Sequence, residues 1–186
     1  MIPKFTEEGY LPQGCHISSI DEFKERFVTD FKDSKSRKSR FEGFIEYTEY
    51  LKLAIKKELI YIINGSFTTK KTNPVDIDFV IVFDLSSLNS TEYAFAQNEA
   101  MKQIEKNIKR HEDLKKVKNE NRDINVVYCC DWYPIYKTTK DDPLYEDYLA
   151  DKEYWLDLFK HSKKDFKKTE NEKGMIKIRL MNRRWC

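Results

Sequence analysis

Apolar residues follow helical spacing in some segments of the chain and form short continuous runs in others. Residues 18–28 and 34–58 carry apolar positions near helical spacing, and Ser18 or Ser19 can cap the first of these helices. The apolar runs 59–64 and 75–84 are strand-sized, and the loop between them begins with Gly-Ser. The pattern therefore predicts two helices followed by a hairpin-like pair of strands.

The second half of the chain continues this succession of helices and strands. Asn89 and Glu92 have the spacing of a capping box, and they open a long predicted helix that runs to about Lys116. A strand over 124–130, a helix over 142–159 and a last strand over 175–180 follow. We therefore predict a single α+β domain over residues 1–186, with a small mixed β-sheet flanked by helices and an N-terminal arm over residues 1–18.

Composition and charge narrow the classes of partner and compartment. Of 186 residues, 40% are hydrophobic and 35% are charged, but the net charge is only +2, so any basic surface must be local. No apolar run approaches the roughly 20 residues that cross a bilayer, and the first residues lack the apolar core of a signal peptide. The four cysteines lack the spacing of a disulfide framework. These features predict a cytoplasmic protein with no membrane partner.

The candidate chemistry lies in residues 62–84, which read IINGSFTTKKTNPVDIDFVIVFD. Glycine at position 65 lets backbone N–H groups approach an anion closely, and Ser66 adds a hydroxyl donor. Asp76 and Asp78 lie two residues apart, so a strand projects both carboxylates from one face, where they repel each other unless a cation lies between them. Divalent metals prefer such oxygens, so the segment predicts an anion cradle beside a metal site.

Lysines and arginines offer weaker candidates. Lys70 and Lys71, in the loop between the two strands, can neutralise a triphosphate, although a lysine pair in a loop also serves solubility. The basic runs 32–41 and 178–186 can contact RNA phosphates or simply be solvated. The low net charge favours the second interpretation of these runs.

The spacing of these residues resembles that of a known superfamily. Gly65-Ser66, a spacer of nine residues and Asp76-Ile77-Asp78 resemble the signature of polymerase-β-like nucleotidyltransferases. Residues 9–28, 66–83 and 154–180 also resemble a group of short, little-characterised bacterial and phage nucleotidyltransferase-like proteins. The resemblance implies the nucleotidyltransferase fold and Mg²⁺- or Mn²⁺-dependent transfer of a nucleotide from an NTP.

The resemblance also implies a role for each candidate residue. Gly65 and Ser66 would hold the triphosphate, and Asp76 and Asp78 would ligate the metal ions. A third carboxylate, on a neighbouring strand, would bind metal and activate the attacking hydroxyl. We expect this residue to be Asp123, because it precedes an apolar strand as Asp76 does; Asp131, at the other end of that strand, is the rival.

The acceptor of the nucleotide is left open by the sequence. By analogy with small stand-alone relatives we expect RNA, and tRNA among RNAs, in a toxin, defence or phage setting. A protein acceptor, as in AMPylating transferases, is an alternative. A further alternative is a catalytically silent module of the same fold that binds a nucleotide or a protein.

Overall fold

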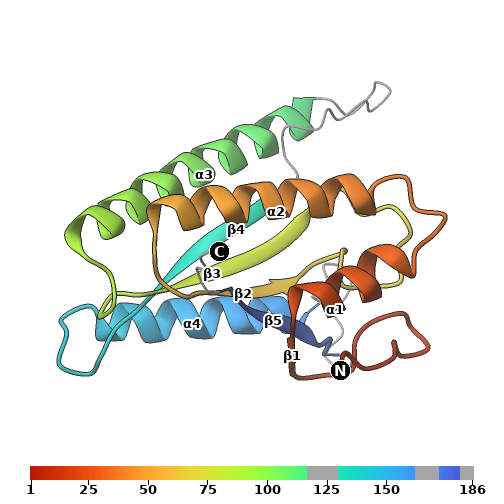
Figure 1. Ribbon diagram of the computed structural model, residues 1–186, viewed down its shortest axis with the longest axis horizontal. Coiled ribbons are helices and arrows are strands. Elements are labelled where there is room, and N and C mark those ends of the chain that lie inside the picture. Colours follow the sequence, from red (N-terminus) through yellow and green to blue (C-terminus); the bar gives the residue numbers. More distant parts are fainter. Residues whose placement is uncertain (117–129, 162–171, 181–186) are drawn as a thin grey trace, which may run out of the picture.

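The described residues form one mixed five-stranded sheet. The computed structural model describes residues 1–116, 130–161 and 172–180, with the backbone alone for 107–116. Its strands are β1 (Cys15–Ser18), β2 (Leu59–Asn64), β3 (Ile77–Asp84), β4 (Cys130–Lys137) and β5 (Met175–Leu180), in the order β1-β5-β2-β3-β4 (Figure 1). β2 is antiparallel to β3 and β5, whereas each edge strand is parallel to its neighbour.

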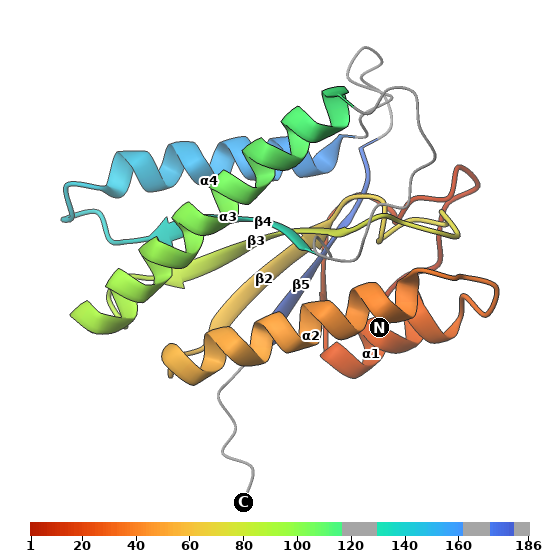
Figure 2. The same ribbon diagram turned by 90° about the horizontal axis from the view of Figure 1, so that it is seen from above.

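Helices cover both faces of this sheet. One face packs against α1 (Ile20–Lys24), the π-helical turn η1 (Glu25–Thr29), α2 (Arg37–Ala54) and α3 (Ser90–Lys116), and the other packs against α4 (Tyr145–Lys160). Figure 2 shows α4 on one side of the sheet and α1 and α2 on the other. The fully buried phenylalanines of the larger core are Phe23, Phe27, Phe44, Phe67, Phe79 and Phe83. The prediction of a mixed sheet flanked by helices is confirmed.

The helix α2 shows how the apolar pattern positions an element. Its buried residues are Arg37, Phe41, Phe44, Thr48 and Leu51, which recur every three or four positions and so form one stripe along the helix. The sequence predicted this helix from its apolar residues. The first position of the stripe, however, holds a fully buried arginine rather than an apolar side chain.

The long helix α3 begins at the predicted capping box. The side chain of Asn89 accepts a hydrogen bond from the N–H of Glu92, and the carboxylate of Glu92 accepts one from the N–H of Asn89, both at 3.0 Å. The second oxygen of Glu92 accepts from the N–H of Lys56, just beyond α2, also at 3.0 Å. α3 connects β3 to β4 and thus provides the crossover that two parallel neighbours require.

Two strands differ from the prediction. The sequence predicted a strand over 124–130, but β4 covers Cys130–Lys137, and residues 117–129 lie outside the described part. β4 contains Pro134, which lacks an N–H group and is tolerated because β4 is an edge strand. β1 lies within the predicted arm; it is short, largely exposed and also at an edge, so no apolar alternation marks it.

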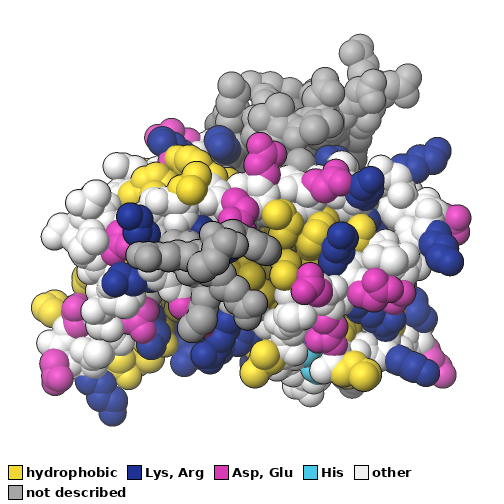
Figure 3. Space-filling model, viewed as in Figure 1, with side chains coloured by type: hydrophobic (Ala, Val, Ile, Leu, Met, Phe, Trp, Pro, Cys, Tyr) yellow, Lys and Arg dark blue, Asp and Glu magenta, His cyan; other side chains and the backbone are white. Residues whose placement is uncertain are grey.

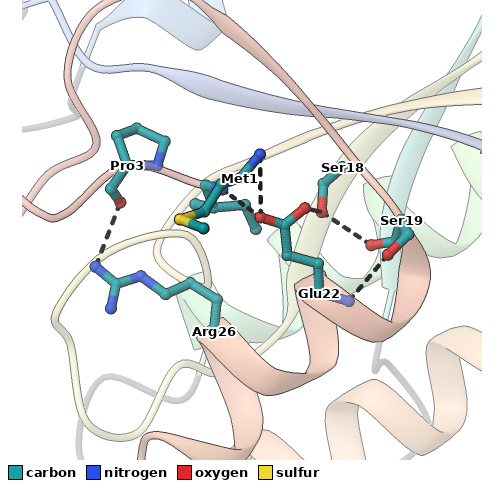
Figure 4. A network of polar contacts seen from close by, with 7 residues as sticks. Met1, Pro3, Ser18, Ser19, Glu22 and Arg26 are labelled. Atoms are coloured by element: carbon teal, nitrogen blue, oxygen red, sulfur yellow. Dashed lines mark hydrogen bonds and ion pairs between the residues drawn. The ribbon is translucent and has the colours of Figure 1, made fainter.

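The segment before β1 packs onto α1. The N–H of Ile2 donates to the carboxylate of Glu22, and Arg26 donates to the carbonyl of Pro3 at 3.3 Å (Figure 4). The hydroxyl of Ser19 caps α1 by accepting from the N–H of Glu22 at 3.1 Å. Because Ile2 and Leu11 are buried in the larger core, this segment contributes to the same core as the helices.

Charges of both signs lie on the face of the molecule drawn in Figure 3. Lysines and arginines are interspersed with aspartates and glutamates over this face. Among the described helices, none combines the length and the apolar character that a membrane span needs.

The capping box provides a test of this fold. Replacing Asn89 by Ala should lower the free energy of unfolding by about 1 kcal/mol, because the N–H of Glu92 loses its acceptor at the start of α3. Asn89→Ser, which keeps an acceptor, should stay near the wild-type value. Urea unfolding followed by circular dichroism measures both, and equal stability of the two variants would contradict the assigned helix start.

Candidate functional site

Three carboxylates converge where β3 and β4 begin. Asp76 immediately precedes β3, Asp78 is the second residue of β3, and Asp131 is the second residue of β4. The parallel register places Asp78 directly beside Asp131. One oxygen of each carboxylate lies within 4.8 Å of the other two. Two strands and the loop that leads into one of them thus contribute to a single acidic cluster.

Strand alternation determines the face on which this cluster lies. Ile77 and Phe79, on either side of Asp78, belong to the core beneath α2 and α3, as does Trp132, which follows Asp131. Because successive side chains of a strand point to opposite faces, Asp78 and Asp131 project toward the face that α4 covers. Further along that face of β4, Tyr133 stacks on Trp155 of α4 with ring centroids 4.2 Å apart.

The separation of the three oxygens suits a divalent cation. Mg²⁺ binds oxygens at about 2.0–2.1 Å, so ligands on opposite sides of one ion lie about 4.2 Å apart. Two ions in a shared site lie roughly 3.5–4 Å apart and spread their ligands further. An oxygen separation of up to 4.8 Å lies within this range. The donor set of Asp76, Asp78 and Asp131 therefore fits Mg²⁺ or Mn²⁺.

Electrostatics adds a reason for a cation at this position. Two unit charges 4.8 Å apart repel by about 3 kcal/mol at the effective dielectric constant of a protein surface. Like charges directly opposite each other on neighbouring strands also destabilise a sheet. Asp76 is only 9% exposed, so water screens its charge poorly. A cation bound among the three carboxylates would offset this repulsion.

The glycine of the Gly-Ser turn is required by the carboxylate beside it. Gly65 has φ +75°, a backbone conformation that residues with a Cβ rarely adopt. A Cβ added at this position would also lie 1.7 Å from Oδ2 of Asp78. Asn64, the residue before the turn, is fully buried, pairs with Asp78 across the sheet and donates to the carbonyl of Gly174 at 3.1 Å. The turn and the acidic cluster are thus in direct contact.

Hydrogen bonds give the turn a defined polarity. The N–H of Gly65 donates to the side chain of Asn64 at 2.6 Å and is therefore engaged within the protein. The carbonyls of Gly65 and Ser66 accept from the hydroxyls of Thr68 and Thr69 at 3.3 and 2.8 Å. In a planar trans peptide the N–H points opposite to the carbonyl. The N–H groups of Ser66 and Phe67 therefore point away from the two threonine hydroxyls.

The remaining predicted residues are placed as follows. Lys70 and Lys71 are exposed, and within the described part of the chain neither ammonium group pairs with the three carboxylates. Asp123 lies outside the described residues, whereas its rival Asp131 lies in the cluster. In the basic run 32–41, both earlier interpretations are wrong for Arg37, which is fully buried and so neither contacts RNA nor is solvated.

Sequence reasoning missed three residues near the turn. Asn64 is the polar end of the predicted strand over 59–64, and Lys173, which is 8% exposed, lies between the predicted helix over 142–159 and the predicted strand over 175–180. Arg37 donates to carbonyls on both sides of Thr68. A signal for Arg37 was present, because it lies four residues before Phe41 on the stripe that α2 buries. Nothing in the sequence marks Lys173.

Comparison with known proteins gives the family of the chain. A family of unknown function, DUF6932, has a model that matches residues 3–179. The chain belongs to this family. The matched region includes the Gly-Ser turn and all three carboxylates of the cluster. No curated protein and no solved structure is significantly similar to the chain.

The contact between Gly65 and Asp78 can be tested by substitution. Gly65→Ala should lower the free energy of unfolding by about 1–3 kcal/mol, because alanine is strained at positive φ. It should also weaken Mn²⁺ binding at least about tenfold, because the new methyl group displaces the carboxylate of Asp78. Calorimetric titration with Mn²⁺ measures the second effect.

Gly14→Ala is the matched control. Gly14 also has positive φ, but a Cβ there would meet no atom closer than 3.8 Å. This variant should lose stability and keep the Mn²⁺ affinity of the wild type. Equal Mn²⁺ affinity of the two variants would mean that the turn does not control the position of Asp78.

Proposed function

We propose that this protein is a metal-dependent nucleotidyltransferase that transfers an NMP from an NTP to an acceptor hydroxyl. The observation that carries the proposal is the convergence of Asp76, Asp78 and Asp131 against the Gly65-Ser66 turn. A carboxylate cluster beside the N–H groups of Ser66 and Phe67, which point away from the two threonine hydroxyls, combines ligands for a metal with donors for phosphate oxygens. The resemblance of the Gly-Ser and Asp-Ile-Asp spacing to nucleotidyltransferases supports the same conclusion.

The chemistry requires a metal, and the donor set fits one. Asp76, Asp78 and Asp131 would hold Mg²⁺ or Mn²⁺. The bound metal would offset negative charge on the attacking and leaving oxygens of a displacement at phosphorus. The third carboxylate in this proposal is Asp131, because it is the candidate that lies directly beside Asp78 in the sheet.

The residues of the chain would divide the work of one in-line displacement. The N–H groups of Ser66 and Phe67 and the hydroxyl of Ser66 hold the triphosphate so that its α-phosphorus faces the acidic cluster. Asp131 orients the acceptor hydroxyl and takes its proton as the oxygen bonds to the α-phosphorus. The bond from that phosphorus to the bridging oxygen breaks, and pyrophosphate leaves. The acceptor thereby gains a nucleoside monophosphate.

RNA is the acceptor class that we propose, with a protein hydroxyl as the alternative. Because charges of both signs are interspersed on the face drawn in Figure 3, that face does not itself indicate RNA. The proposal for RNA therefore rests on analogy with small nucleotidyltransferases. The simplest way for a protein of this fold to become a catalytically silent binding module is to lose one of the three carboxylates. The presence of Asp131 in the cluster favours the enzyme over such a module.

A labelling experiment tests the proposal. The protein is incubated with each α-labelled NTP, Mg²⁺ and either total RNA or total protein, and the products are separated on a gel. We expect label on one acceptor class in the presence of Mg²⁺. Asp78→Asn and Asp131→Asn should each reduce labelling at least about 100-fold, which corresponds to roughly 3 kcal/mol in the barrier.

Asp84→Asn is the matched control for these variants. Asp84 is the last residue of β3, far along the strand from Asp78, and its carboxylate bonds to Lys137 at 2.6 Å. The Asp84→Asn variant should label the acceptor as strongly as the wild type does. Full activity of Asp131→Asn together with loss in Asp123→Asn would assign the third carboxylate to Asp123. Full activity of all the cluster variants would end the enzymatic interpretation.

A further inference from the structure

The loop that follows the Gly-Ser turn is built around a buried arginine. Arg37, the first residue of α2, is fully buried, and its two terminal nitrogens donate to four backbone carbonyls. The acceptors are Phe27 at 2.8 Å, Phe67 at 2.7 Å, Thr69 at 2.8 Å and Lys71 at 2.6 Å. Three of these carbonyls belong to the segment directly after Gly65-Ser66.

Aromatic rings and carbonyl dipoles surround the charge of Arg37. Its guanidinium carbon lies 3.7 Å from the ring centroid of Phe31 and 4.9 Å from that of Phe67. Burial lowers the pKa of Arg37 to about 10, so the group remains a cation at neutral pH. Within the described part of the chain no carboxylate forms an ion pair with it. Among the described residues, backbone carbonyl dipoles and the faces of two aromatic rings stabilise its positive charge.

The contacts with Arg37 fix the direction of the peptide groups in the loop. Because the carbonyls of Phe67, Thr69 and Lys71 point at the guanidinium, the N–H groups of the following residues point away from it. Phe67 is anchored as well, since its ring stacks on Phe23 in the core with an interplanar angle of 14°. The N–H of Lys70, which follows Thr69, donates to the carbonyl of Gly9 at 2.8 Å and is thus engaged within the protein. Arg37 therefore orients above all the peptide group between Phe67 and Thr68, whose N–H points away from the guanidinium.

Other residues at the start of α2 hold the rest of the loop. Arg40 donates to the carbonyl of Val75 at 2.6 Å, and the hydroxyl of Ser36 donates to the carbonyl of Pro74 at 2.8 Å. The N–H of Lys35 donates to the side chain of Asn73 at 2.7 Å. Figure 2 shows the beginning of α2 lying beside this loop. The loop from the turn to Asp76 is therefore fastened along its length to one helix end.

We propose that Arg37 is a positioning residue for the triphosphate group of the substrate, acting through the 65–71 segment. It holds the carbonyl oxygens of that segment away from the anion and places a buried positive charge behind the donors. This inference rests on the proposed function, because it assigns the anion to the Gly-Ser turn. Lysine cannot replace Arg37, because a single ammonium group cannot reach four carbonyls in the planar arrangement of a guanidinium.

Binding measurements on Arg37 variants test this proposal. Arg37→Lys keeps the positive charge but loses the planar guanidinium, and Arg37→Met loses both the charge and the guanidinium. With Mg²⁺ and a non-hydrolysable ATP analogue, we expect each variant to bind at least about tenfold more weakly than the wild type. Affinity for Mn²⁺ alone should stay within about twofold, because the carboxylates lie outside the contacts of Arg37. A variant that was merely less stable would not lose affinity for the ATP analogue while keeping its affinity for Mn²⁺.

Arg26→Met is the matched control. Arg26 also stacks on a phenylalanine, at 4.4 Å from the ring centroid of Phe5, but bonds to Asp30 and Pro3 instead of the loop. It should lose stability and keep its affinity for the analogue. If the wild type binds the analogue and the Arg37 variants bind it equally well, the role of Arg37 is refuted and the proposed function survives. A wild type that binds no nucleotide refutes both.

Amide NMR of the wild type covers the case in which the Arg37 variants do not fold. Adding the analogue with Mg²⁺ should shift the N–H resonances of Ser66, Phe67 and Thr68 and protect them from exchange. The N–H of Gly65, already bonded to Asn64, should shift less. Nucleotide binding without any change at Ser66, Phe67 and Thr68 would overturn the proposal.

Discussion

The parallel pairing of β3 with β4 is the constraint on which the site depends. It places Asp78 directly beside Asp131, an arrangement that costs stability in a sheet because like charges are opposed. The long crossover helix α3 makes this pairing available, and the capping box at Asn89 fixes where that helix starts. The acidic cluster is thus a consequence of sheet topology, and the spacing of its oxygens fits a divalent cation.

The buried positive charge of Arg37 complements the acidic cluster. Arg37 holds the carbonyls of the segment after Gly65, and Gly65 lets the carboxylate of Asp78 lie against the turn. Negative side chains therefore stand on one side of the turn, and a positive charge stands behind the loop that follows it. Such an arrangement of opposite charges suits a ligand that is itself a metal–anion complex. An NTP bound to Mg²⁺ is a ligand of this kind.

The parts of the molecule that the sequence predicted are those with a local physical signal. The bounds of α3 and the strands β2 and β3 follow from capping and apolar runs. Asp76 and Asp78 lie together as predicted, although Asp76 immediately precedes β3 and is not part of the strand. The sequence did not predict β4 because a proline such as Pro134 usually indicates a loop. Pro134 is tolerated here because β4 lies at the edge of the sheet. The position of Arg37 on the buried stripe of α2 was a signal for its burial, but its contacts were hidden because they involve carbonyls 30 to 34 residues away, at Phe67, Thr69 and Lys71. The position of Asp131 beside Asp78 likewise depends on the strand register, which no single segment encodes.

The most direct test of the central claim is to locate the metal itself. Crystals grown with Mn²⁺ and a non-hydrolysable NTP can be measured at a wavelength where manganese scatters anomalously. We predict anomalous peaks between the carboxylates of Asp76, Asp78 and Asp131, with the phosphates reaching the N–H groups after Gly65. Manganese bound elsewhere, with nucleotide present and these three carboxylates free of metal, would contradict the account.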